Sequence, residues 1–258
     1  MAAIAPIFEP DPPTLPVSWT ISGTSAVATL GEYQVTVDAA VPRSGVTWSS
    51  TATNAFQGST LQFVEPISAK SPPVLVDLYV RGSDLVATYD QLPGAEVQPQ
   101  LYWRLLQEDS LQAVGVQLLI SMQTSLLNSE PKCTVESKLP TARTAIWDFI
   151  SQDWLGSQAD QPFNVKLPAL STGRVTWFSV PKQAQSYIEV IYPDDFVSQQ
   201  VSLGKIESCF FAEHLEKGVI RRGRIAGWIV PNKNLMTAAR EPLKLLDFAR
   251  REALPLTT

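Results

Sequence analysis

The residues best suited to chemistry surround the only histidine of the chain. The segment EHLEKGVIRRGR combines two glutamates, the histidine and three arginines, namely Glu213, His214, Glu216, Arg221, Arg222 and Arg224. A carboxylate beside a histidine can transfer protons, and arginines can hold an anion through paired N–H donors. The same residues also suit the end of a hairpin whose charge pairs face water. Strand alternation would place Glu213 and His214 on opposite faces of a sheet, which weakens a joint role.

A second candidate group consists of aspartates. Its members are Asp77, Asp84, Asp90, Asp194 and Asp195. Glycoside hydrolysis requires paired carboxylates, so such a group is relevant to sugar chemistry. Asp77 is distinctive because it interrupts the apolar strand pattern VLVDLYVR. Three of the others lie at turn signals, where aspartate commonly bonds to its own backbone.

Aromatic residues form the third candidate group. The chain contains seven tryptophans. A platform on which sugar rings stack could be formed by five of these tryptophans and three tyrosines, namely Trp103, Trp147, Trp154, Trp177, Trp228, Tyr79, Tyr89 and Tyr102. The alternative is that these rings pack in the core with their one polar atom satisfied.

Composition excludes several classes of site and partner. With one histidine and two cysteines, the chain cannot complete a structural zinc site, and the common nucleotide-binding and hydrolase motifs are absent. We therefore expect no cofactor and no metal. A net charge of −5 argues against nucleic acid as a partner. No run approaches the length of about 20 apolar residues needed to cross a membrane.

The start of the sequence and its cysteines indicate the compartment in which we expect the protein. The start MAAIAPIFEP lacks the basic and apolar regions of a secretory signal, so we expect a cytoplasmic protein. Two cysteines far apart in the sequence, Cys133 and Cys209, are then expected to be free and buried.

Short strand patterns separated by turn signals every 8–15 residues run through most of the chain. They predict an all-β fold, a large antiparallel β-sandwich of a dozen or more strands that resembles a supersandwich. The segment Val114–Met122 is almost entirely apolar, which predicts a central strand buried on both faces.

The segment Val201–Val230 is predicted to be a hairpin that turns at Glu216–Gly218. Gly218 would adopt a positive φ, as the third position of such a loop requires. In this register Glu213 lies opposite Arg221, Phe211 covers Gly223, and Arg224 lies on the ring of Phe210.

Two helices are predicted. Residues 141–155 show helical spacing of apolar residues, and we favour a short helix there over the alternative of a strand. Residues 235–253 are also amphipathic, and Pro242 would begin a second helical segment. The predicted organisation is an extended proline-rich arm over residues 1–16, the sandwich over 17–231, and a helical segment over 232–258 that packs on the sandwich.

In size and strand number the chain is similar to large two-sheet sandwiches such as the galactose-mutarotase-like proteins, which handle sugars. Epimerases of that group use more than one histidine, so no catalytic residue is implied here. We predict a carbohydrate- or protein-binding module without catalytic activity. The alternatives are a sugar-active enzyme, epimerase- or glycosidase-like, that uses Asp or Glu with His214 or an arginine, and a structural or assembly protein.

Overall fold

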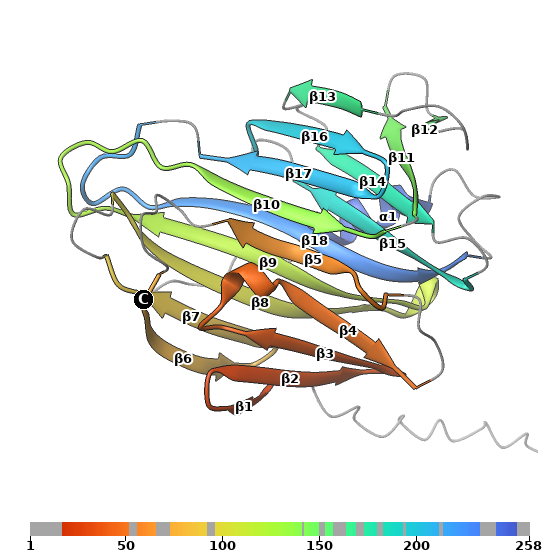
Figure 1. Cartoon of the computed structure of the whole chain (residues 1–258), viewed down its shortest axis with the longest axis horizontal. Coiled ribbons are helices and arrows are strands. Elements are labelled where there is room, and N and C mark those ends of the chain that lie inside the picture. Colours follow the sequence, from red (N-terminus) through yellow and green to blue (C-terminus); the bar gives the residue numbers. More distant parts are fainter. Residues whose placement is uncertain are drawn as a thin grey trace, which may run out of the picture.

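The computed structural model describes residues 17–51, 56–65, 73–91, 96–140, 142–149, 153–156, 164–168, 173–179, 183–192, 195–211, 214–232 and 241–251. It is a β-sandwich of two nine-stranded sheets, and every strand pairing in it is antiparallel (Figure 1). The predicted fold class is thereby confirmed.

The first sheet has the order β1-β2-β3-β4-β5-β10-β17-β16-β13. Its strands are β1 (Thr20–Ser22), β2 (Ser25–Leu30), β3 (Tyr33–Asp38), β4 (Val46–Ser50), β5 (Thr60–Glu65), β10 (Cys133–Lys138), β17 (Lys205–Phe210), β16 (Ser198–Ser202) and β13 (Asn164–Pro168).

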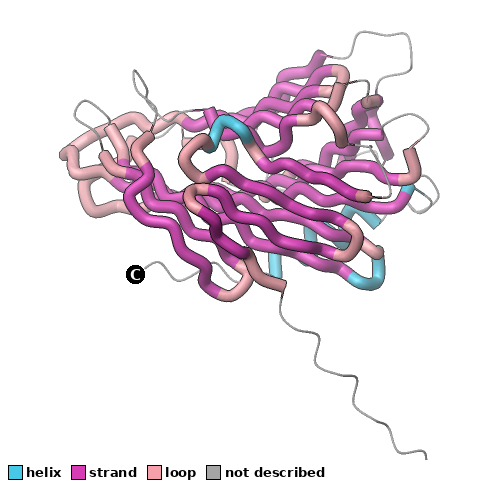
Figure 2. The backbone as a smooth tube through the Cα atoms, turned by 60° about the horizontal axis from the view of Figure 1, so that its bottom comes forward, coloured by secondary structure: helices cyan, strands magenta, loops and turns pink. Residues whose placement is uncertain are grey.

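The second sheet has the order β12-β11-β14-β15-β18-β9-β8-β7-β6. Its strands are β12 (Asp153–Gly156), β11 (Arg143–Asp148), β14 (Arg174–Ser179), β15 (Gln185–Ile191), β18 (Arg221–Pro231), β9 (Ala113–Gln123), β8 (Gln98–Glu108), β7 (Asp84–Tyr89) and β6 (Leu75–Arg81). Helical structure is confined to two 3-10 turns (Pro42–Ser44, Asp109–Leu111) and one α-helix among the described residues (Figure 2).

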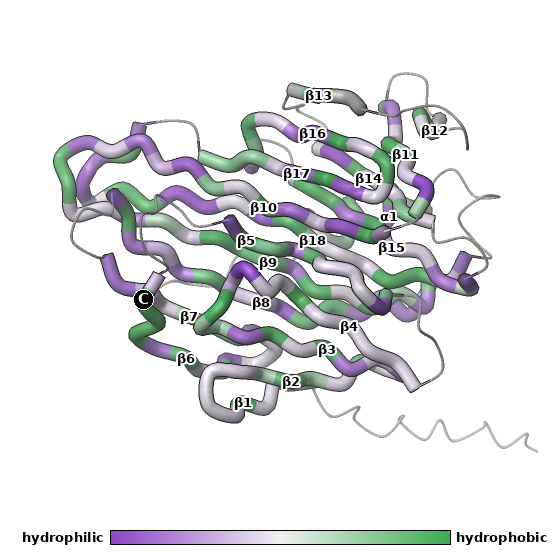
Figure 3. The backbone as a smooth tube through the Cα atoms, viewed as in Figure 1, coloured by the Kyte–Doolittle hydropathy of each residue, from purple (hydrophilic) through white to green (hydrophobic). Residues whose placement is uncertain are grey.

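The main core lies between the two sheets, because one face of each sheet is apolar. Hydrophobic and hydrophilic residues alternate along many strands, as the two-residue period of a strand requires (Figure 3). Strand β9 is the exception: Val116, Leu118, Leu119 and Ile120 are all buried, at 0–2% exposure. Its neighbours β8 and β18 flank it on both sides, which confirms the predicted central strand.

Helix α1 (Glu241–Arg251) covers part of the outer face of the second sheet. Leu245 and Leu246 are buried there, and the ring of Phe248 meets that of Trp228 at a centroid distance of 5.4 Å. The sequence correctly predicted this amphipathic helix, which begins at Glu241, one residue before the predicted start at Pro242. Residues 233–240, where the predicted helical pattern begins, lie outside the described residues.

The predicted internal helix over residues 141–155 is wrong. Residues 143–148 form β11 and residues 153–156 form β12, which pair with each other. Trp147 lies opposite Trp154, and their rings meet edge to face at 5.3 Å. Aromatic and β-branched residues favour strands when a neighbouring strand is available, and that tertiary choice overrides a weak helical spacing.

The predicted hairpin pairing is also wrong. Strand β17 pairs with β10 and β16 in the first sheet, whereas β18 pairs with β9 and β15 in the second. The chain therefore crosses from one sheet to the other between residues 211 and 220. The positive φ of Gly218 is confirmed, at 83°, within a turn closed by the bond from the Val219 amide to the Glu216 carbonyl.

Candidate ligand-binding face

The outer face of the second sheet divides into two halves of different chemistry. Over β14, β15 and the end of β18 it is apolar and lies under α1. Over β6 to β9 and the start of β18 it is polar, and we call this half the polar face. Its members are Asp77, Tyr79, Arg81, Asp84, Thr88, Gln98, Gln100, Tyr102, Arg104, Gln117, Ser121, Gln123, Arg222 and Arg224.

Antiparallel register aligns these side chains in rows across the sheet. One row runs from Asp77 through Thr88, Gln100 and Ser121 to Arg222. Residues directly opposite each other in neighbouring strands share a face and lie within contact distance. Strand pairing, rather than proximity in the sequence, therefore brings residues from five strands into one surface.

Two ion pairs hold arginines rigidly in this surface. Arg104 binds Asp84 through two bonds, Nε to Oδ1 at 2.6 Å and Nη2 to Oδ2 at 3.0 Å, and both side chains are largely buried. Arg224 Nε donates to Asp195 Oδ2 at 2.7 Å, and its guanidinium lies 4.0 Å from the centroid of the Tyr192 ring. Bidentate and stacked guanidinium groups of this kind have fixed orientations.

Amide and hydroxyl groups continue this network across the strands. Gln100 accepts a hydrogen bond from the Tyr102 hydroxyl and donates one to Thr88 Oγ1 at 2.8 Å. Gln123 donates to Gln98 Oε1 at 2.6 Å. These bonds orient the side chains before any ligand arrives, which lowers the entropic cost of binding one.

Tyr102 lies at the centre of the polar face, where it contacts Val86 and Leu119 with Tyr79 beside it. Burial raises the pKa of the Tyr102 hydroxyl, and the positive charges of Arg81 and Arg222 partly oppose that increase. The hydroxyl therefore stays protonated at neutral pH. Arg81 on β6 and Arg222 on β18 lie on the same face of the sheet as this phenol.

A groove of about 310 Å³ opens beside this network. It is lined by Asp77, Tyr79, Thr88, Gln98, Pro99, Gln100, Ser121, Gln123 and Ile220. Pockets that bind small molecules combine an apolar surface with a few oriented polar groups and begin at about 300 Å³. The groove therefore has the size and the chemistry of a site for a small polar ligand.

The structure brings together some of the residues that the sequence indicated. Asp77, Arg222 and Arg224 lie on the polar face, although Asp77 is far from the two arginines in the chain. Asp84 and Asp195, from the predicted acidic group, hold the two arginines. Arg221 is exposed at the start of β18.

Other predicted residues lie elsewhere. His214 is exposed outside the strands, with its Nδ1 3.6 Å from Glu130 Oε1. Trp103 is buried between the sheets, and Trp177 packs beside Trp154 in the apolar half of the outer face. Arg224 stacks on Tyr192 rather than on Phe210. Glu213 lies outside the described residues.

Sequence reasoning named the two tyrosines of the polar face, Tyr79 and Tyr102, but missed its glutamines. Gln98, Gln100, Gln117 and Gln123 alternate with apolar residues along β8 and β9. Such alternation is an ordinary solvent-facing pattern, so it gives no sign of a site. The signal becomes visible only when the strand register is known.

Comparisons with known proteins identify structures with a similar fold but no relative by sequence. No protein-family model and no curated protein matches the chain. A putative aldose 1-epimerase from Klebsiella pneumoniae is similar in structure, with a TM-score of 0.54 and 7% identity, over 93% of this chain and 90% of that one. A putative kojibiose phosphorylase from the human microbiome aligns with a TM-score of 0.51 and 10% identity.

That second alignment covers 92% of this chain but only 33% of the phosphorylase. At these identities both comparisons establish a shared fold alone. Across the described ranges, no helix is long and apolar enough to span a bilayer. Within the same ranges, no three His, Cys, Asp or Glu side chains are grouped as metal ligands would be.

Proposed function

We propose that this protein binds carbohydrate on the polar face, with the sugar seated in the groove between Asp77, Tyr79 and Gln123. The observation that carries the proposal is the set of oriented amides, hydroxyls and guanidinium groups around a groove that Tyr79 lines, on the half of the sheet that α1 does not cover. Sugar hydroxyls both donate and accept hydrogen bonds, and carboxylates, amides and arginines together meet both needs.

Aromatic side chains supply the second requirement of a sugar site. The C–H face of a pyranose packs on a ring that is apolar on its face and polar at its tip, as tyrosine is. Tyr79 is half-buried and lines the groove, so part of its ring is available. Both structures with a similar fold carry the names of sugar-acting proteins, which is consistent with this proposal.

A sugar-active enzyme is the second candidate, and Asp77 is the observation that favours it. Asp77 is an exposed carboxylate in the groove, whereas Asp84 and Asp195 are engaged by arginines. An uncommitted carboxylate beside a bound sugar can act as a general acid or base. His214 has no part in either candidate, because it does not line the groove.

The experiment begins with a glycan array probed by the intact protein, followed by calorimetry with the sugars that bind. We expect Asp77→Ala and Tyr79→Ala each to weaken binding at least tenfold, which corresponds to about 1.4 kcal/mol. Glu207→Ala is the matched control, since it removes a strand carboxylate from the opposite sheet. His214→Ala should also leave affinity unchanged. Absence of sugar binding, or equal losses in the control, would contradict the proposal.

Assays of the bound sugar separate the two candidates. Polarimetry follows exchange of anomers, and release of reducing ends follows glycoside cleavage. If the protein is an enzyme, Asp77→Asn should abolish turnover while retaining most of the binding. If it is a binding protein, neither assay will show a rate above background for the unmodified chain.

A further inference from the structure

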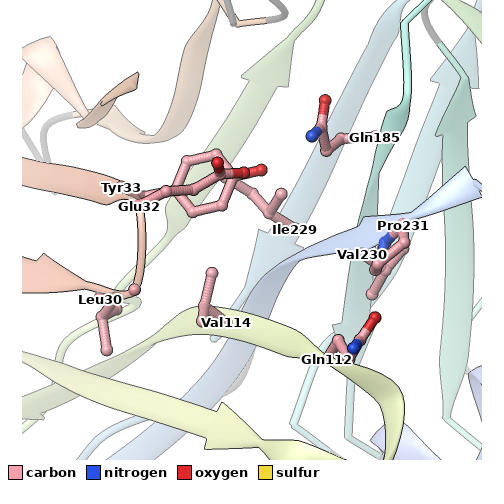
Figure 4. Close-up of a pocket in the computed structure, with 10 residues that line it drawn as sticks. Leu30, Glu32, Tyr33, Gln112, Val114, Gln185, Ile229, Val230 and Pro231 are labelled. Carbon is pink, nitrogen blue, oxygen red and sulfur yellow. The ribbon is translucent and has the colours of Figure 1, made fainter. Parts of the chain in front are cut away.

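A separate pocket of about 260 Å³ opens between the two sheets at one end of the sandwich (Figure 4). The first sheet contributes the β2–β3 turn, and the second contributes the beginnings of β9 and β15 and the end of β18. No residue lines both this end pocket and the groove of the polar face. Its volume lies just below the usual range for drug-sized ligands, so it suits only a small molecule.

The shape of the end pocket depends on two left-handed backbone positions. Gly31, with φ of 59°, allows β2 to turn into β3 within two residues, and no atom lies within 4 Å of where its side chain would be. Gln112, with φ of 51°, ends the 3-10 turn before β9. Both residues line the pocket, so the turns that end the strands also form its walls.

The inner surface of the end pocket is apolar. Leu30 and Ile229 are each 1% exposed and belong to the core between the sheets. Val114 packs against the same core and lies opposite Ile229 in the β9–β18 pairing. A ligand in this pocket therefore needs an apolar portion.

The polar side of the end pocket is acidic. Glu32 is the single formally charged residue among those that line it. Burial raises the pKa of the neighbouring Tyr33 hydroxyl well above its ordinary value, and a hydrogen bond to the Glu32 carboxylate raises it further. A bond from Gln185 has the opposite effect. Tyr33 thus remains protonated beside the exposed carboxylate of Glu32.

Figure 4 shows Glu32 and Tyr33 on one side of the pocket, with Gln185 and Pro231 across from them. Because Glu32 and Gln185 come from different sheets, a ligand between them would contact both layers of the sandwich. A carboxylate provides more acceptor positions than one phenol can fill, so Glu32 can accept further donors.

We propose that the end pocket binds a small organic cation, a primary amine with a short apolar chain. The ammonium group would donate to the Glu32 carboxylate, and the carbon chain would lie on Leu30, Val114 and Ile229. A primary ammonium has three donors and no acceptor, which matches a carboxylate site. Anions are disfavoured by Glu32, and a neutral alcohol lacks the charge interaction. This site does not depend on the sugar site.

The test compares n-butylammonium chloride with butan-1-ol by saturation-transfer NMR on the full chain. The two probes have similar apolar chains and differ mainly in charge. We expect saturable binding of the amine with a Kd at least tenfold lower than that of the alcohol. Glu32→Gln should remove this preference, because it keeps the size of the side chain and removes the charge. Val114→Phe should abolish binding of both probes by filling the pocket.

The matched control is Glu207→Gln, which removes the same charge from the outer face of the first sheet. It should leave amine affinity unchanged. Circular dichroism of each variant verifies that the sandwich is retained. The proposal is overturned by equal affinity for the two probes, by the absence of saturable binding, or by a Glu207→Gln variant that loses as much affinity as Glu32→Gln.

Discussion

Glu189 is the most unusual single residue of the core, because it is a carboxylic acid with 1% exposure between two sheets. Ser137 from the opposite sheet donates to its Oε2 at 2.5 Å, and the Tyr187 hydroxyl donates to the same oxygen at 3.2 Å. Its Oε1 has no hydrogen-bond partner within the described part of the chain. Burial raises the pKa of Glu189 to about 7, although the two hydrogen bonds oppose that increase.

This pKa makes stability depend on pH in a definite direction. The unfolded chain loses the Glu189 proton near pH 4.5, whereas the folded chain retains it until about pH 7. The contribution of Glu189 to stability is therefore complete below pH 4.5 and is lost as the pH rises to about 7. A shift of this size corresponds to about 3 kcal/mol.

We predict that Glu189→Gln removes this pH dependence. The variant should gain roughly 3 kcal/mol relative to the unmodified protein between pH 4.5 and pH 8, because glutamine has no proton to lose. Urea unfolding of both proteins at the two pH values measures the difference. A stability difference that is the same at both pH values would show that Glu189 is solvated or ionised in the fold.

At the scale of single residues, the sequence singled out Asp77 because it interrupts an apolar strand pattern, and the structure places it exposed on the polar face. The sequence could not indicate Glu189, which looks like an ordinary alternating polar residue in QSYIEVI. It also named His214 as a candidate, and the structure places this side chain exposed near Glu130 and outside the groove. The surroundings of each side chain depend on its burial and on the strand register, and neither can be predicted from a short sequence segment.

Among the elements, β9 carries the most direct stability prediction. Leu118 is fully buried between the sheets, so Leu118→Ala should destabilise the protein by about 2–5 kcal/mol through lost transfer energy and the cavity it leaves. Val76→Ala on β6 is the control, since Val76 is 61% exposed, and it should cost less than about 0.5 kcal/mol. Chemical denaturation measures both. A Leu118→Ala cost below about 1 kcal/mol would place β9 at an edge.

The turn before β18 carries a second prediction. Gly218 has φ of 83°, a conformation that a β-branched residue tolerates poorly, so Gly218→Val should cost more than about 1 kcal/mol. No atom lies within 4 Å of the position a side chain would occupy, so the cost reflects backbone strain and not a clash. Glu216→Ala in the same turn is the control. Equal unfolding midpoints for the two variants would contradict the assignment.

The wrong pairing predicted for β17 and β18 shows that a local sequence pattern can predict strands and turns but not which strands pair. Both strands were recognised, and so was the glycine of the intervening turn. The pairing of the two strands was predicted wrongly, because complementary residues can meet either side by side in one sheet or face to face across the core. Gly223 illustrates this: the ring that lies over it belongs to Phe210 of the opposite sheet, and not to Phe211 as a cross-strand partner.

For the whole molecule, strand number and turn spacing were enough to predict a large antiparallel sandwich. They were not enough to predict the polar face, because that surface depends on the order of five strands that are spread from residue 75 to residue 231. The placement of α1 over one half of the same sheet also could not be predicted, although its amphipathic pattern could. That placement leaves the other half uncovered by the helix.

The central claim is that the polar face is where this protein binds its ligand, and a chemical-shift map tests it most directly. The spectrum of backbone amides and glutamine side-chain amides would be recorded with and without a sugar selected on the glycan array. The claim predicts the largest shifts in the groove on β6 to β9, at the backbone amides of Asp77 and Tyr79 and the side-chain amides of Gln98, Gln100 and Gln123. Shifts confined to the end pocket or to the surroundings of His214, with these groove signals unmoved, would contradict it.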